Sequence, residues 1–316
     1  KEEKNIVSIV DSPYPIYMWF DNGTIYWWSE DKTPSLNPDS SQMFRNLNNL
    51  ENISGLSSYD ASRTTTLQTC FAYTKLNNIS ALSSWDTSNV ESMSNTFAAM
   101  PNLTNLNGID NWNLSKVLTI QGMFMNDYLL EDISSLKKWD VSRVENMRAL
   151  FQNNNSISNI TPLQSWNVSN VKTMNRMFFG NQTYHNKIES LLPLKDWNTS
   201  SLEDMELMFQ ASEKITNIDG LENWNVSSVK TMSGLFNNCY MLESVDLSNW
   251  DMSSVTNTTF MLSGTDLTKI KTPKVYPNDS SVSIELPLIL YDENGNQYNS
   301  LNKESPTEIL LIISAR

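Results

Sequence analysis

The sequence predicts an elongated α/β repeat protein. About eight similar units, each a short strand followed by a short helix, are expected to stack between two β caps. Three observations predict this: an aromatic residue that recurs at nearly constant spacing, a fixed set of small and apolar residues around it, and too few apolar residues in any one unit for that unit to fold alone.

The repeat is defined by one aromatic position, which holds Tyr once and Trp seven times. The spacings between successive aromatics are 26, 27, 27, 27, 31, 27 and 26 residues. Phe follows twelve residues later in the first seven units and ten residues later in the eighth, and Ser follows three residues later in all eight. The eight aromatics are Tyr59, Trp85, Trp112, Trp139, Trp166, Trp197, Trp224 and Trp250.

Each unit contains two expected elements. In the second unit, Val90, Met93 and Phe97 have the i, i+3, i+7 spacing of a buried helical face, and Ser88 is placed to cap that helix. The preceding Leu-x-x-Ile-x-x-Leu segment, residues 76–82, is too short for a second helix and is predicted to be a strand. Stacking then predicts a right-handed solenoid of the leucine-rich-repeat type, with a parallel sheet on one side and helices on the other.

The ends of the chain are predicted to be β caps. Residues 16–28 have the pattern of a hairpin with a turn at Asp21-Asn22-Gly23, and residues 308–313 are predicted to be a last strand. The expected divisions are 1–39 for the first cap, 40–265 for the solenoid and 266–316 for the second cap. Two closed ends favour a monomer.

Composition limits the partners. The chain has 316 residues and a net charge of −13, which disfavours nucleic acid and anionic lipid. The longest apolar run, 309–313, is too short to span a bilayer, so no membrane insertion is expected in this segment. Residues 1–4 lack the apolar core of a signal peptide, so we expect that any leader has already been removed.

Cysteine and histidine are scarce. Cys70 and Cys239 lie six units apart, about 29 Å along the stack, so we expect free thiols rather than a disulfide. The single histidine, His185, falls in a four-residue insertion between Phe178 and Ile188, which predicts an exposed loop. We therefore expect no metal site and no cofactor.

The residue after each repeat aromatic is always Asp or Asn. Stacking could bring Asp60 and Asp86 to the roughly 5 Å carboxylate separation of a retaining glycosidase. A catalytic pair occurs once, however, whereas this position recurs in every unit and is Asn in half of them, which favours Asx turns. Calcium is a further alternative, but with nine Gly in the chain the turns lack the residues that bend around an ion. We expect no enzyme and no catalytic residue.

A second polar ladder precedes each repeat aromatic and is expected to point outward from the sheet. It is either a solvated face that keeps the sheet soluble or an extended, polar, low-affinity binding face. Its candidate ligand-binding residues are Asn78, Ser80, Asn105, Asn107, Asp132, Ser134, Asn159, Thr161, Asn217 and Asp219.

The N-terminal hairpin is unusually aromatic. Trp19, Trp27 and Trp28 form either a lid over the first unit or a sugar-binding platform. Exposed and coplanar rings would favour the platform, and buried rings would favour the lid.

The unit W-D-T-S-N-V-x-x-M-x-x-x-F, which recurs over residues 40–263, resembles the repeat of the BspA-like leucine-rich-repeat surface proteins of bacteria. The flanking segments 15–26 and 288–295 also resemble that family, whereas the first unit departs from it with Tyr59 and Thr64. The resemblance implies a secreted or wall-attached bacterial protein, with adhesins among its relatives, and carries over no catalytic residue.

The functional hypothesis combines the repeat with this resemblance. We expect a non-enzymatic surface scaffold that mediates adhesion to, or recognition of, host or neighbouring-cell surfaces. Its expected partner is a host extracellular-matrix protein or a surface glycan. The alternative is a carbohydrate-binding module that uses the N-terminal aromatics.

Overall fold

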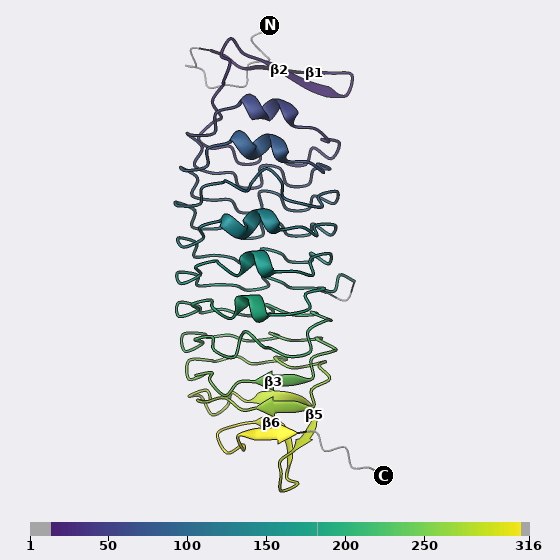
Figure 1. Ribbon diagram of the computed structural model, residues 1–316, viewed down its shortest axis with the longest axis vertical. Coiled ribbons are helices and arrows are strands. Elements are labelled where there is room, and N and C mark those ends of the chain that lie inside the picture. The colour runs from purple at the N-terminus through teal and green to yellow at the C-terminus, as the bar shows by residue number, and fades with distance from the viewer. Residues whose placement is uncertain (1–13, 182, 311–316) are drawn as a thin grey trace.

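A computed structural model describes residues 14–181 and 183–310, which form a tall column of stacked units (Figure 1). The two strands of the N-terminal hairpin lie at one end and a five-stranded sheet lies at the other. The elements are β1 Tyr17–Asp21, β2 Thr24–Trp28, η2 Ser54–Ser58, η3 Ser80–Ser84, η4 Ser134–Lys138, η5 Thr161–Leu163, η6 Leu192–Leu194, β3 Ser244–Asp246, β4 Lys269–Lys271, β5 Ile284–Tyr291, β6 Gln297–Leu301 and β7 Glu308–Leu310.

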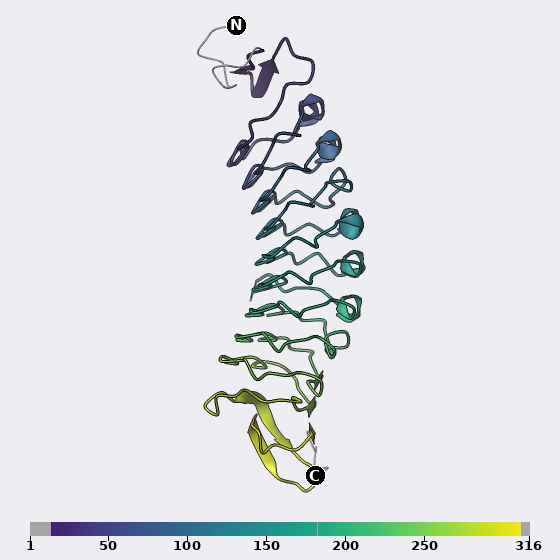
Figure 2. The ribbon, with the colours of Figure 1, turned by 90° about the vertical axis from the view of Figure 1, so that its left-hand side faces the viewer.

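Successive units are joined by parallel bridges between equivalent residues. The first bridge joins Ser35 to Asp60, so stacking begins before the expected boundary at residue 40. Figure 2 shows the units edge-on, with the 3-10 helices, η2–η6, along one side and narrow turns along the other. One row of bridges follows the column through Asp39, Thr66, Ser92, Thr119, Asn146, Thr173, Asp204, Thr231 and Asn257.

The helix expected after each Trp is not formed, and the described residues contain 3-10 helices but no α-helix. In the second unit the backbone N–H groups of Met93, Asn95, Phe97 and Ala99 donate to carbonyls of the next unit, over 2.7–3.0 Å. Between them, the N–H groups of Thr96 and Ala98 donate to carbonyls three residues back, and that of Ser94 donates to the Ser92 hydroxyl. We call this stretch, from each bridge residue to about eight residues later, the turn segment. Its hydrogen bonds join units, as in a sheet.

The prediction failed because the turn segment has a period of four residues. Asn95 and Ala99 have φ of 54° and 58°, and left-handed residues recur at the same two places in most units. Two consecutive turns of four residues place side chains at nearly the spacing of a helix. The predicted burial was correct, because Val90, Met93 and Phe97 are completely buried. A segment this short would also be a poor isolated helix.

The strand expected before each Trp is also largely replaced. In five units this stretch contains a 3-10 helix instead, and a named strand appears there only as β3. The side chain of Asn78 is one cause, because its Oδ1 accepts the N–H of Ser80 at 2.8 Å and turns the chain into η3. A parallel bridge joins Asn105 to Asp132 in a unit that lacks the helix.

The core consists of rows of identical side chains. The rings of successive Phe residues from Phe44 to Phe236 stack with centroids 5.3–5.9 Å apart. Each Trp from Trp85 to Trp250 donates its Nε1–H to a backbone carbonyl of the preceding unit, over 2.9–3.2 Å. This bond explains the repeated Trp, because a buried indole N–H needs an acceptor.

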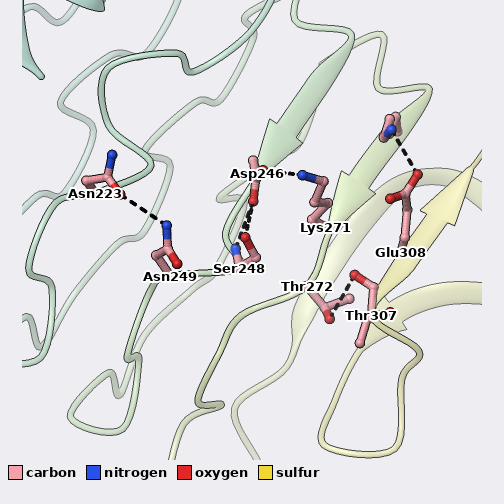
Figure 3. Close-up of polar contacts among 9 residues, drawn as sticks. Asn223, Asp246, Ser248, Asn249, Lys271, Thr272, Thr307 and Glu308 are labelled. Atoms are coloured by element: carbon pink, nitrogen blue, oxygen red, sulfur yellow. Dashed lines mark hydrogen bonds and ion pairs between the residues drawn. The ribbon is translucent and has the colours of Figure 1, made fainter.

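The C-terminal cap continues the column through β-strand pairing and through side-chain hydrogen bonds and ion pairs. Its strand order is β3-β4-β7-β5-β6, with β4 parallel to β3 and antiparallel to β7. Figure 3 shows the ion pair between Lys271 and Asp246, whose Nζ and Oδ2 atoms lie 2.7 Å apart. It also shows Thr272, whose hydroxyl donates to the backbone carbonyl of Thr307 at 3.4 Å. The predicted last strand is confirmed over β7, while residues 311–313 lie outside the described part of the chain.

The N-terminal cap is the predicted hairpin. β1 and β2 pair antiparallel around Asn22 and Gly23, whose positive φ values of 43° and 83° are typical of a type I′ turn. Trp27 packs on Tyr59 with ring centroids 4.7 Å apart. The hairpin therefore touches the first repeat aromatic as a lid would.

Candidate functional site

The polar ladder proposed as a binding face serves the fold. The Oδ1 atoms of Asn78, Asp132 and Asn159 each accept the N–H two residues on, over 2.8–2.9 Å, and Asn105 and Asn217 do the same. Asn78, Asp132 and Asn159 are exposed, as expected, whereas Asn105 and Asn217 are half-buried, and the Oδ1 atom of each already accepts a backbone N–H. The partners are Ser80, Ser134, Thr161, Asn107 and Asp219, so all ten candidate residues belong to Asx turns.

The Asx-turn interpretation of the residue after each aromatic is confirmed. Asp60 and Asp86 accept the N–H of Ser62 and Ser88, each at 2.9 Å, and the equivalent Asn residues behave alike. The N–H of Ser62 lowers the pKa of the Asp60 carboxyl. A general acid needs the opposite shift, so Asp60 is poorly suited to act as one.

A third Asx-like corner was missed from the sequence. The bridge residues of the turn segments also accept the N–H two residues on, as Asn146 does from Arg148 at 2.9 Å. The signal was a small polar residue directly before each Met, which the sequence carries in most units. Each unit therefore has three corners built in the same way.

The outer face of the N-terminal hairpin carries exposed aromatic rings. Trp19 and Tyr26 are 40% and 43% exposed, and their rings stack with centroids 5.7 Å apart and planes 14° apart. Tyr17 and Trp28, the neighbouring cross-strand pair on the same face, lie 5.8 Å apart at 48°. We call these four residues the aromatic platform.

Trp27 does not belong to that platform. Side chains alternate along a strand, so Trp27 points to the other face of β2 and lies against the first unit. The sequence analysis left two alternatives, lid or platform; Trp27 contacts the first unit as a lid would, whereas Trp19 and Trp28 lie on the opposite face of the hairpin. Tyr26 completes the stacked pair and was not among the predicted residues.

The insertion loop forms a cluster that was not expected. His185 was predicted to be an exposed loop residue; instead its side chain is only 26% exposed and its Nδ1 lies 3.2 Å from Oε2 of Glu213. Tyr184 stacks on Tyr128 with centroids 4.2 Å apart, and His185 lies against Tyr240. The insertion therefore contacts earlier and later units, through Tyr128 on one side and Glu213 and Tyr240 on the other.

Both cysteines are free and buried, as predicted. Burial raises the pKa of the Cys239 thiol to about 12 and also raises the pKa of Cys70, which makes both poor nucleophiles. Within residues 14–181 and 183–310 no cluster of three or more His, Cys, Asp or Glu side chains is placed to bind a metal ion. No helix in the same ranges has the length and apolar character needed to cross a bilayer.

A buried carboxyl, Asp127, was also missed. Its Oδ1 accepts the N–H of Met100 at 2.7 Å, while no described donor reaches Oδ2. Burial raises the pKa of this carboxyl well above its ordinary value. Asn154 occupies the equivalent position one unit on and accepts the N–H of Asp127, so this carboxyl lies inside a polar row of the core rather than in a cleft.

Comparisons with curated proteins and with solved structures identify no close relative of this chain. No curated protein matches the sequence. The crystal structure of an internalin from Listeria monocytogenes is similar at 19% identity and a TM-score of 0.20, over 69% of this chain and 77% of that one. A TM-score this low assigns no fold.

The third comparison concerns the repeat itself. Residues 38–133, 99–192, 125–218 and 187–272 each match one family model. These overlapping stretches together span 38–272, which is more than half of the chain. The protein therefore belongs to the family described as Mycoplasma protein of unknown function, DUF285.

Proposed function

We propose that this repeat protein is a non-enzymatic scaffold at the bacterial cell surface or secreted from the cell. It holds the aromatic platform against glycans of host or neighbouring-cell surfaces. The observation that carries the proposal is the stacked, exposed pair Trp19 and Tyr26 at one end of the column. Flat, exposed aromatic faces suit the apolar faces of sugar rings.

The setting rests on sequence resemblance. The repeat and both flanks resemble the BspA-like surface proteins, which supports an extracellular location and a leucine-rich-repeat-type, right-handed solenoid. Parallel bridges between equivalent residues of successive units support the solenoid. The absence of an enzymatic role is part of the same proposal.

Adhesion to a matrix protein through the polar ladder is the second candidate. Asn and Asp side chains run along the 3-10 side of the column, and the exposed amide nitrogen of Asn78 and second carboxylate oxygen of Asp132 have no hydrogen-bond partner among the described residues. A contact of this kind would be extended and weak, because the ladder has few aromatic or Arg anchors.

Binding to a glycan array and to immobilised matrix proteins tests both candidates. Three proteins are compared: the unchanged chain, Trp19→Ala/Tyr26→Ala, and Tyr240→Ala as a matched loss of an exposed aromatic far from the hairpin. Circular dichroism checks that each is folded. Glycan binding that only the double variant loses supports the platform. Matrix binding that all three share supports the ladder instead, and no binding on either panel overturns the adhesion proposal.

A further inference from the structure

The first unit leaves one edge of its backbone open. In every later unit, four carbonyls of the turn segment accept N–H groups from the unit before. In the second turn segment, for example, the four carbonyls are those of Thr66, Gln68, Cys70 and Ala72, and the donors are the N–H groups of Ser40, Gln42, Phe44 and Asn46. Among the described residues, no unit precedes the first turn segment. No donor from the described residues reaches its equivalent carbonyls, those of Asp39, Ser41, Met43 and Arg45.

Three of these four residues, Asp39, Ser41 and Met43, line a cavity at the end of the column. This cavity of about 910 Å³ separates the hairpin from the first unit. Asp39, Ser41 and Met43 line one wall, and Met18, Ile25 and Trp27 of the hairpin line the opposite wall. Its size is that of a ligand site, and its lining is largely apolar with a few polar groups.

The row of stacked Phe rings also ends in this cavity. Phe44 stacks on Phe71 with centroids 5.3 Å apart, and its side chain is one of the cavity walls. No aromatic ring among the described residues stacks on Phe44 from the other side. The cavity therefore presents both an end of the ring row and a row of acceptors at alternate residues.

A polypeptide fits both features. Carbonyls at alternate residues match the N–H groups at alternate residues of a neighbouring chain, as between any two units here. One side chain of such a chain would lie on Phe44. Glycan hydroxyls could reach the carbonyls, but they would leave the apolar walls of Met18, Ile25 and Trp27 without apolar contacts.

A second copy of this chain is a poorer occupant. The donors that could continue the column are the N–H groups of its last turn segment at Phe260, Leu262 and Gly264, which have no acceptor among the described residues. At this end the Thr258 hydroxyl already donates to the carbonyl of Ser283 in the C-terminal cap, at 2.7 Å, so the cap stands where a second column would have to stack.

We propose that the cavity between the hairpin and the first unit is a peptide-binding site. It takes an extended segment of another protein, whose alternate N–H groups donate to the carbonyls of Asp39, Ser41 and Met43 while an aromatic or large apolar side chain stacks on Phe44. This site is separate from the aromatic platform, which faces away from the first unit, and does not depend on glycan binding.

The test uses a peptide with a known ability to neighbour a turn segment. Residues 90–100 of this chain, VESMSNTFAAM, form such a neighbour in the column. The labelled peptide is titrated with the full chain and followed by fluorescence anisotropy. The control peptide is N-methylated at the residues equivalent to Met93, Asn95 and Phe97, which removes three donors and leaves every side chain unchanged.

Two protein variants locate the site. Ser41→Phe fills the cavity, and Thr259→Phe makes the same change at the equivalent exposed position of the last turn segment. We expect saturable binding of the peptide, at least tenfold weaker binding after N-methylation or in Ser41→Phe, and a change of less than twofold in Thr259→Phe. Equal binding of the two peptides, or no binding at all, overturns the proposal.

A further variant distinguishes an external partner from the chain's own first residues. Deleting residues 1–13 should leave the peptide affinity within about threefold if the site is open to other proteins. A tenfold gain on deletion would mean that those residues compete for the cavity, and the proposal of a partner protein would be wrong.

Discussion

The two ends of the column are capped in different ways. At the C-terminal end, β4 is paired on both edges, and Ile270, Ile284 and Ile309 are completely buried. At the N-terminal end, β1 and β2 pair with no other described strand, and a cavity of about 910 Å³ separates them from the first unit. One cap continues the backbone bonds of the column, whereas the other covers it with side chains.

This difference assigns different roles to the two caps: the C-terminal cap stabilises the fold, and the N-terminal cap carries the candidate binding features. A cap that extends the hydrogen bonding of the last unit is part of the cooperative structure. A hairpin held by contacts such as that of Trp27 with Tyr59 can keep aromatic rings exposed on one face and a cavity on the other. The candidate binding features therefore gather at the end that is less tightly sealed.

The largest expected effect comes from disrupting the buried contact between β4 and β7. Ile309→Asp places a carboxylate opposite the buried Ile270, with no partner for the charge, and should destabilise the protein by about 4 kcal/mol or more. Ile25→Asp makes the same change on the hairpin, where the side chain is exposed, and should cost less than about 1 kcal/mol. Urea unfolding followed by circular dichroism measures both, and equal losses would contradict the contrast between the caps.

The next effect compares an interior Trp with a hairpin Trp. Trp139→Phe removes the Nε1–H that donates to the carbonyl of Ile109 at 2.9 Å, which should cost about 1–3 kcal/mol. Trp27→Phe removes an indole that donates to no described carbonyl, so its cost should be smaller. The same unfolding curves give both values. A larger loss for Trp27→Phe would place the hairpin within the cooperative core.

A third prediction uses pH to probe the interior away from both ends. Burial raises the pKa of Asp127 in the folded chain, so the protonated form is favoured there. The stability that this group contributes is complete below its ordinary pKa of about 4 and is lost as the pH rises from there toward the raised folded value.

Asp127→Asn removes that dependence while keeping the acceptor for the N–H of Met100. The variant should be more stable than the unchanged chain at pH 7, by about 1–3 kcal/mol, and nearly equal to it at pH 4. Thermal unfolding across this range tests the sign. A variant less stable at pH 7 would show that the charged carboxylate has a partner.

The smallest effect concerns the surface of the column. Glu145, Lys172, Glu203 and Lys230 occupy equivalent positions in successive units and alternate in sign, with Lys172 2.6 Å from Glu145 and Lys230 bonded to Glu203. Glu145 raises the pKa of Lys172. These side chains are exposed, so Lys172→Met should leave the unfolding midpoint unchanged in 0.15 M salt. A clear loss would mean that the row acts as a network.

The repeat, its register and its buried residues could be predicted from the sequence, because stacking requires equivalent residues at constant spacing. The conformation of each unit could not be predicted in the same way. Val90, Met93 and Phe97 are buried at helical spacing in either an α-helix or two consecutive four-residue turns, and only the bonds to neighbouring units distinguish them. Positive φ at Ala99 or Leu207 carries no signal in residue type.

The candidate site was predictable in part. A hairpin with adjacent Trp residues indicated both a lid and a platform, and strand alternation could have assigned Trp27 and Trp28 to opposite faces. The stacking of Tyr184 on Tyr128 could not have been predicted, because it depends on how far the insertion loop reaches. The open carbonyls of the first turn segment depend on which unit comes first, which requires the structure.

Hydrogen exchange of the free protein, followed by mass spectrometry, tests the contrast between the ends most directly. The account predicts that the amides of β4 and β7 exchange as slowly as those of the central turn segments, while the amides of β1 and β2 exchange at least tenfold faster. Equal protection of the hairpin and the C-terminal sheet would contradict the account, since both ends would then be sealed alike.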